Sequence, residues 1–197
     1  MELVIATRNK KKVEEIRRIL EGIPIVLYTL DDFPDCPEVE EDAGSFEGNA
    51  IKKAVAVAAY AGKPALSDDS GLEVYALGGA PGVLSARYAG EGADDRKNIA
   101  KLLAELHDVD DSERGARFVC CIALAFPGGP VETFEGNVGG RIGRDQRGFN
   151  GFGYDPVFYP EGHGRTFAEM GADEKDGLSH RGRALKKLRD YLSVMPH

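Results

Sequence analysis

Two adjacent acids, Asp68 and Asp69, stand in the stretch SDDSG between a short apolar approach and an apolar exit. A turn built from Asp, Ser and Gly would account for them, and so would a divalent-cation site. In an extended segment, neighbouring side chains point to opposite faces. The two carboxylates are therefore expected to have different roles, one facing a ligand and the other facing backbone or a neighbouring helix.

A basic stretch, ATRNKKK at residues 6–12, is predicted to lie where a strand meets a helix. The first turn of a helix offers free N–H groups and a positive dipole end, which suit phosphate. Thr7 and Asn9 can hydrogen-bond or cap, whereas Lys10, Lys11 and Lys12 oppose the helix dipole, which favours an anionic partner. A capped helix with a solvated lysine run is the competing interpretation, and no Walker loop is present.

A cluster of acids lies further along at Glu40, Glu41 and Asp42. One or two carboxylates are enough for Mg²⁺, which keeps several waters and bridges to substrate phosphates. A solvated loop explains most of these acids as well, and their spacing alone does not choose among them.

Two later stretches carry further candidates. In GFGYDP, residues 151–156, glycines flank Phe152, so that backbone can approach a ligand closely and the ring offers a platform for a base. In EKDGLSHRGRALKKL, Ser179 is expected to cap the last helix, with His180 and Arg181 in its first turn. The competing interpretation is a Gly-rich connection with core aromatics, a structural His and a solvated Arg. No HExxH or GxSxG motif supports zinc hydrolysis or a serine triad.

The elements that must position these residues alternate between strand and helix patterns. Strands are predicted at residues 2–6, 23–28, 117–126 and 131–142, with a strand, a turn and a second strand across 64–77. Helices are predicted within residues 7–22, 45–62, 94–107 and about 181–194. This order indicates a mixed α/β protein. We expect a single domain over residues 1–197, without a sharp internal boundary.

Composition narrows the class of protein. The chain has 197 residues and a net charge of −8, which argues against a general affinity for nucleic acid. It has no 18-residue apolar run, and its N-terminus does not resemble a signal peptide, so that we expect no membrane association. Cys36, Cys120 and Cys121 have no CxxC spacing, and they indicate reduced thiols in a cytoplasmic protein.

Taken together, five stretches resemble the inosine triphosphate pyrophosphatase family over nearly the whole chain. They are T-x-N-x-x-K at residues 7–12, SDDSGL with LGGAPGVLSARY, GFGYDPVF, TFAEM, and EK…LSHRGRAL. The resemblance implies an α/β fold with a long mixed central sheet and flanking helices, in two lobes around an active-site cleft, and a homodimer. It also implies Mg²⁺-dependent hydrolysis of ITP, dITP and XTP to the monophosphate and pyrophosphate.

The same resemblance assigns roles to individual residues. Asp69 matches the catalytic carboxylate, which accepts a proton and binds the metal, and Glu41, with Glu40 close behind, matches a second metal ligand. The residues that match substrate contacts are Thr7, Arg8, Asn9, Lys10, Lys11, Lys12, Lys53, Ser70, Phe152, Gly153, Tyr154, Asp155, Lys175, His180 and Arg181. Arg181 carries only donors, which suit the O6 atom of inosine or xanthosine and not the amino group of adenine.

Two other functions compete with this one. A Maf-like pyrophosphatase of different base specificity is disfavoured by the GFGYDP and SHR stretches. A non-catalytic nucleotide-binding module would not need paired carboxylates for a metal, and Asp69 with the acids at 40–42 therefore disfavours it.

Overall fold

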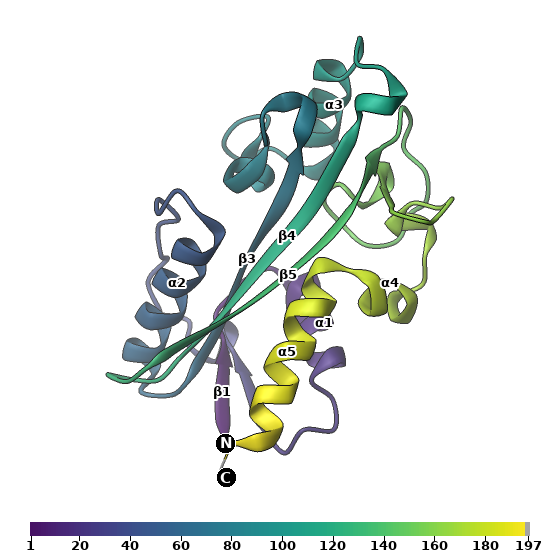
Figure 1. Cartoon of the computed structure of the whole chain (residues 1–197). Helices are drawn as coiled ribbons and strands as arrows, with labels where there is room; N and C mark the ends of the chain where they lie inside the picture. The colour runs from purple at the N-terminus through teal and green to yellow at the C-terminus, as the bar shows by residue number, and fades with distance from the viewer. Residues whose placement is uncertain (196–197) are drawn as a thin grey trace. The chain divides into compact units, whose positions relative to one another are not determined.

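The computed structural model describes residues 1–195 and contains a six-stranded sheet in the order β2-β1-β3-β4-β5-β6 (Figure 1). The strands are β1 (Glu2–Ile5), β2 (Val26–Thr29), β3 (Ala65–Val74), β4 (Gly115–Ala125), β5 (Val131–Ile142) and β6 (Phe158–Pro160). Strand β1 pairs in parallel with β2 and β3, whereas β5 and β6 are antiparallel. The sheet is therefore mixed, and the prediction of a mixed α/β fold is confirmed.

The N-terminal strand leads into helix α1 (Lys10–Ile19), which begins where Asn9 caps it. Asn9 Oδ1 accepts hydrogen bonds from the backbone N–H groups of Lys11 and Lys12, at 3.1 and 3.3 Å. The next strand starts at Val26, three residues later than predicted. The reason is local, because the N–H groups of Ile23 and Ile25 bond inside the turn that follows α1.

Helix α2 (Phe46–Ala61) has the boundaries that its caps predict. The Ser45 hydroxyl accepts a hydrogen bond from Gly48 N at 3.0 Å, and Gly62 ends the helix in the left-handed region at φ 62°. The small residues Ala50 and Ala54 are fully buried, which allows α2 to pack closely.

Strand β3 corrects one prediction. A strand, a turn and a second strand were expected across 64–77, but residues Ala65–Val74 form one continuous strand. The polar residues in its middle do not make a turn because buried partners on both faces satisfy them, as described below. The turn follows later, as a short 3₁₀ segment at Tyr75–Leu77.

The remaining elements follow the predicted order. Helix α3 (Asp95–Glu105) begins after Asp94, whose side chain accepts from Lys97 N at 2.9 Å. The long strands β4 and β5 are joined by a turn closed by the hydrogen bond from Phe126 N to Pro130 O, at 3.1 Å. A short helix that was not predicted, α4 (Ala172–Leu178), precedes α5 (His180–Val194).

The chain divides into two compact units. Unit 1 contains Met1–Asp69, Cys120–Gly136 and the chain from Arg181 onward, and unit 2 contains Ser70–Val119 and Asn137–His180. The chain therefore passes between the units four times, at Asp69–Ser70, Val119–Cys120, Gly136–Asn137 and His180–Arg181. The single-domain prediction extends to residues 196–197, which lie outside the described residues.

Each unit has its own hydrophobic core. In unit 1, apolar residues of β1, α1 and α5 pack with Leu66 of β3 and with Cys120, Ile122 and Leu124 of β4. In unit 2, apolar residues of α3 pack with the outer halves of β3, β4 and β5 and with the segment 154–170. These cores fix α1 and α5 in the first unit, and α3 and the 154–170 segment in the second.

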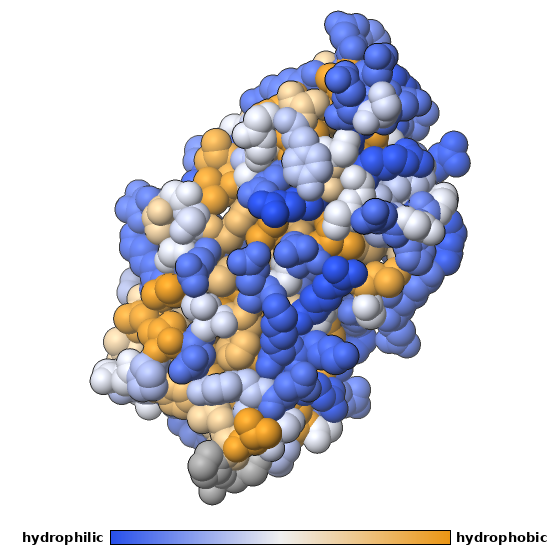
Figure 2. Space-filling model, viewed as in Figure 1, coloured by the Kyte–Doolittle hydropathy of each residue, from blue (hydrophilic) through white to orange (hydrophobic). Residues whose placement is uncertain are grey.

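The surface is mostly hydrophilic on the face that Figure 2 shows, with hydrophobic residues in several separate places. Among residues 1–195, no helix is long and apolar enough to cross a membrane. The three cysteines are all free and buried.

Candidate active site

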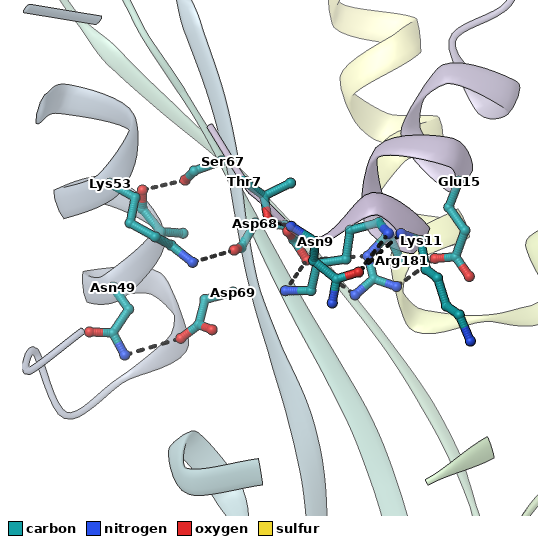
Figure 3. A network of polar contacts seen from close by, with 12 residues as sticks. Thr7, Asn9, Lys11, Glu15, Asn49, Lys53, Ser67, Asp68, Asp69 and Arg181 are labelled. Carbon is teal, nitrogen blue, oxygen red and sulfur yellow. Dashed lines mark hydrogen bonds and ion pairs between the residues drawn. The ribbon is translucent and has the colours of Figure 1, made fainter. Parts of the chain in front are cut away.

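The alternation of side chains along β3 separates the two adjacent acids. Asp68 receives its ionic partners from α1 and α5, whereas Asp69 is hydrogen-bonded by Asn49 of α2 (Figure 3). Both side chains are buried, with exposures of 1% and 6%. The prediction that the two carboxylates face opposite sides is therefore confirmed.

Asp68 is the centre of a buried ion network. Its Oδ2 atom lies 3.0 Å from Lys12 Nζ and accepts from Nε and Nη2 of Arg181, at 3.2 and 3.1 Å. Arg181 Nη1 donates to Glu15 Oε2 at 2.5 Å. Burial alone would raise the pKa of Asp68, but the positive charges of Lys12 and Arg181 outweigh it and hold this pKa well below its ordinary value.

Asp69 has a different environment. Its Oδ2 atom accepts a hydrogen bond from Asn49 Nδ2 at 3.0 Å. Its pKa is raised, chiefly because the carboxylate is buried and secondarily because Glu41 adds a like charge, while Lys53 acts in the opposite direction. A buried carboxylate with a raised pKa is a better proton acceptor than an ordinary Asp, which is the property expected of a general base.

Lys53 links the two acids to the acidic loop. Its Nζ atom lies 2.6 Å from Glu41 Oε1 and 2.7 Å from the backbone oxygen of Asp68. Burial would lower the pKa of Lys53, but the charges of Asp68, Asp69 and Glu41 outweigh it, and the net pKa is raised. Lys53 is therefore held in its cationic form beside Asp69.

The basic start of α1 is arranged differently from a free phosphate-binding helix end. Asn9 occupies the N–H groups of Lys11 and Lys12, and Lys12 directs its amino group to Asp68. Lys10 and Lys11 are exposed. Arg8 donates from Nη2 to Cys36 O at 3.0 Å.

A pocket of about 130 Å³ in unit 1 brings several predicted residues to one place. Thr7, Arg8, Glu41 and Lys53 all line it. Thr7 is half-buried, and its Oγ1 atom accepts from Asn9 N at 3.2 Å. Glu40 is exposed, whereas Glu41 is only partly so, and Glu41 is the acid that the structure places beside Lys53.

In unit 2, the predicted base loop is held by Asp155. The Asp155 Oδ2 atom accepts from Phe152 N at 3.0 Å and from Lys175 Nζ at 2.7 Å, and both charged side chains are buried. The Lys175 amino group also lies 4.8 Å from the centre of the Phe152 ring. Gly151 has a positive φ of 72°, and a Cβ there would come within 2.1 Å of Asp155 Oδ2, so that only glycine fits.

Contacts elsewhere in unit 2 support this loop. Gly153 N donates to Asp95 Oδ2 at 2.8 Å, and the buried Tyr154 hydroxyl donates to Ser85 O at 2.7 Å. His180 is also buried, and its ring stacks on Phe118 with 4.6 Å between the ring centres. Ser70 is half-buried in β3.

Two residues in the polar site of unit 1, Asn49 and Glu15, were not predicted from the sequence. Asn49 lies four residues before Lys53 on a predicted helix, so that helical spacing alone puts both on one face. That spacing is the signal that would have found it. Glu15 lies in a run of charged residues, and no feature of that run reveals that its side chain is buried at 7% exposure.

The carboxylates of unit 1 supply some of the oxygen ligands that a hard cation such as Mg²⁺ requires, but not all of them. Within residues 1–195, no group of three or more His, Cys, Asp and Glu side chains is placed to hold a metal ion. Asp69 and Glu41 are close enough that each other's charge matters, because Glu41 raises the pKa of Asp69. Two carboxylate oxygens fit the pattern of Mg²⁺, which takes few protein ligands and fills its shell with water and phosphate oxygens.

The fold and these residues define a mixed α/β protein with a buried carboxylate and lysine site in one unit and a Gly-rich aromatic loop in the other. The Ham1 family profile matches residues 3–191. The chain belongs to this family, and the resemblance carried by its motifs is confirmed.

Similar proteins cover nearly the whole chain. A dITP/XTP pyrophosphatase of Geobacter sulfurreducens is 56% identical over 190 residues, which is 96% of each chain. One from Desulforamulus reducens is 51% identical over 98% of this chain and 96% of its own. Among solved structures, a HAM1 protein from Coxiella burnetii superposes with a TM-score of 0.91 at 43% identity, covering 99% of this chain and 100% of that one.

Proposed function

We propose that this protein hydrolyses the non-standard purine nucleoside triphosphates ITP, dITP and XTP to the monophosphate and pyrophosphate. The observation that carries the proposal is Asp69, a buried carboxylate with a raised pKa that lies beside Lys53 and Glu41. Membership of the Ham1 family, with relatives named dITP/XTP pyrophosphatases, supports the choice of substrate.

Asp69 acts as the general base. Its carboxylate takes a proton from the water that attacks the α phosphorus, and Asn49 fixes its orientation through the hydrogen bond to Oδ2. The raised pKa makes this carboxylate more basic, while the charge of Lys53 favours its ionised form. Pyrophosphate leaves as the bond between the α phosphorus and the bridging oxygen breaks.

The triphosphate requires positive charge around it. Lys53 supplies positive charge next to Asp69. Arg8 and Thr7 line the same unit 1 pocket as Lys53. Lys12 is joined to Asp68, which holds its amino group at a fixed position at the start of α1. Lys10 and Lys11, which are exposed, add to the attraction of an anion at longer range.

Asp69 and Glu41 are the residues that would hold Mg²⁺. When bound, the ion neutralises phosphate charge and lowers the pKa of water. We assign the second ligand to Glu41 and not to Glu40, because Glu41 lines the pocket with Lys53 whereas Glu40 is exposed.

We assign the base to the loop of unit 2. The Phe152 ring offers a stacking surface, and Gly153, Tyr154 and Asp155 hold the loop in place together with Lys175. Arg181 directs Nε, Nη1 and Nη2 to Asp68 and Glu15. That Arg181 recognises the O6 atom of the base stays a prediction. The contacts of Arg181 favour a different role, in which it positions Asp68.

Pyrophosphate release from ITP, XTP, dITP, ATP, GTP and dTTP, each with Mg²⁺ and with EDTA, tests the proposal. We expect ITP, dITP and XTP to be hydrolysed fastest and EDTA to abolish release. Preference for dTTP would indicate the Maf-like function, and binding without turnover would indicate a non-catalytic module.

Two further properties are part of the proposal. The protein forms a homodimer, which light scattering coupled to size exclusion will measure, and it acts in the cytoplasm without binding nucleic acid polymers or membranes. The net charge of −8 supports the absence of nucleic acid binding.

A further inference from the structure

A second polar pocket lies in unit 2 and shares no residue with the candidate active site. It has a volume of about 300 Å³ and is lined by four arginines, together with Asp111, Asp145 and Tyr159. The arginines are Arg114, Arg141, Arg144 and Arg147. Four positive and two negative side chains leave the lining with a net positive charge, in a protein whose net charge is −8.

Arg114 is a buried cation whose hydrogen bonds go to backbone oxygens. It is 2% exposed, and its three donor nitrogens bond the backbone oxygens of Ile142, Leu106 and Gly143, at 2.9, 2.6 and 2.8 Å. The pKa of Arg114 is lowered, first by burial and then by the positive charge of Arg144. Asp111 acts in the opposite direction, but the direct hydrogen bonds of Arg114 go to backbone dipoles, and an anion that comes near this buried charge stabilises it.

Arg144 is also fixed in place. It donates from Nε to Asp111 Oδ1 at 2.7 Å and makes longer bonds to the backbone oxygens of His107 and Val109. Both Arg114 and Arg144 are therefore held by the protein before any ligand arrives, which reduces the entropy lost on binding.

The other two arginines have donors available to a ligand. The Arg141 guanidinium lies 4.2 Å above the centre of the Tyr159 ring, and stacking occupies its faces but not the N–H groups at its edge. The backbone of Arg147 is fixed by bonds to Pro156 and Thr166. Within residues 1–195, neither guanidinium has a carboxylate within 4 Å.

We propose that this pocket binds a phosphate-type anion at a site separate from the one that hydrolyses nucleotides. The edges of Arg141 and Arg147 bond the phosphate oxygens, since the planar guanidinium matches their geometry. Arg114 and Arg144 supply the surrounding positive potential. The same chemistry serves free pyrophosphate and the phosphate group of a nucleoside monophosphate.

Isothermal titration of inorganic pyrophosphate into the full chain, without divalent metal and at constant ionic strength, tests the site. We expect two binding events in the wild type. Arg141→Gln with Arg147→Gln should weaken one of them at least about tenfold, or about 1.4 kcal/mol. Lys53→Met should weaken the other, so that the result does not depend on the proposed function.

Arg96→Gln is the matched control, because Arg96 is an exposed arginine of the same unit outside the pocket. Unchanged pyrophosphate binding in the double variant overturns the proposal. Equal weakening of pyrophosphate binding by Arg96→Gln also overturns it, because it would mean diffuse attraction to surface charge. Titration of the Lys53→Met protein with inosine monophosphate distinguishes the two possible ligands, free pyrophosphate and a nucleoside monophosphate. Tighter binding of inosine monophosphate than of pyrophosphate identifies a nucleotide as the ligand. The side chains replaced in the double variant, Arg141 and Arg147, are both exposed. Thermal unfolding checks that the double variant keeps its fold.

Discussion

Asp68 and Asp69 are neighbours in the chain, yet their carboxylates lie on opposite faces of β3 and have opposite pKa shifts. The pKa of Asp68 is lowered because Lys12 and Arg181 outweigh its burial. That of Asp69 is raised because burial outweighs the charge of Lys53. One acid is therefore a fixed anion in an ion network, and the other is able to accept a proton.

Asp69→Asn should reduce turnover of ITP by at least about 10²-fold, because the amide cannot accept the proton of the attacking water. Pyrophosphate release under saturating substrate measures this. Asp42→Asn is the control, since Asp42 is an exposed acid that pairs with Lys52 at the surface, and it should leave turnover unchanged. Turnover near that of the wild type in Asp69→Asn would exclude Asp69 as the base.

Asn49→Ala should shift the acid limb of the pH profile of kcat/KM to higher pH. The hydrogen bond from Asn49 lowers the pKa of Asp69, so that its removal lets this pKa rise further. The base must be ionised to act, and activity is therefore lost at a higher pH as the solution is acidified. A limb that stays in place or moves to lower pH contradicts this account of Asp69.

Asp68→Asn should lower the free energy of unfolding by about 3–5 kcal/mol, because Lys12 and Arg181 lose their buried counter-charge. Urea denaturation measures the change. The folded-state pKa of Asp68 is below its unfolded value of about 3.8, so that its contribution is complete above that pH and is lost as the pH falls further. Glu2→Gln removes the charge of an exposed pair with Lys63 and keeps an oxygen that can accept from the Tyr28 hydroxyl, so that it should have little effect.

Arg181→Ala should reduce activity on ITP and ATP in the same proportion. Its donors hold Asp68 and Glu15, and loss of that network displaces Lys12 for either substrate. The ratio of the two kcat/KM values is the measurement. A larger loss on ITP than on ATP would restore the role that the sequence predicted, in which Arg181 reads O6.

The thiols of Cys120 and Cys121 should be unreactive in the folded protein at pH 8. Burial raises the pKa of Cys121 to about 12, and that of Cys120 is raised in the same direction for the same reason. Only the thiolate attacks, so that alkylation at these positions should wait for unfolding. Mass spectrometry after brief iodoacetamide treatment, with and without urea, checks this, and rapid labelling of Cys121 without urea contradicts it.

Local patterns were sufficient for most of the fold. The capping residues Asn9 and Ser45 predicted where two helices begin, because capping depends on residues within one turn. The same local reasoning failed at residues 65–74. There, Asp, Ser and Gly indicated a turn, but the ionic partners that stabilise an extended chain come from helices far away in the sequence.

The sequence by itself determined that Asp68 and Asp69 differ, since alternation along a strand is a property of the backbone. Its motifs, through family resemblance, also predicted that Asp69 is the catalytic carboxylate. Only the tertiary structure decided the partners: Arg181, 113 residues from Asp68 along the chain, neutralises it, while Asn49 orients Asp69. Packing of α1, α2 and α5 against the strands makes these contacts, and such long-range packing leaves no local pattern in the chain.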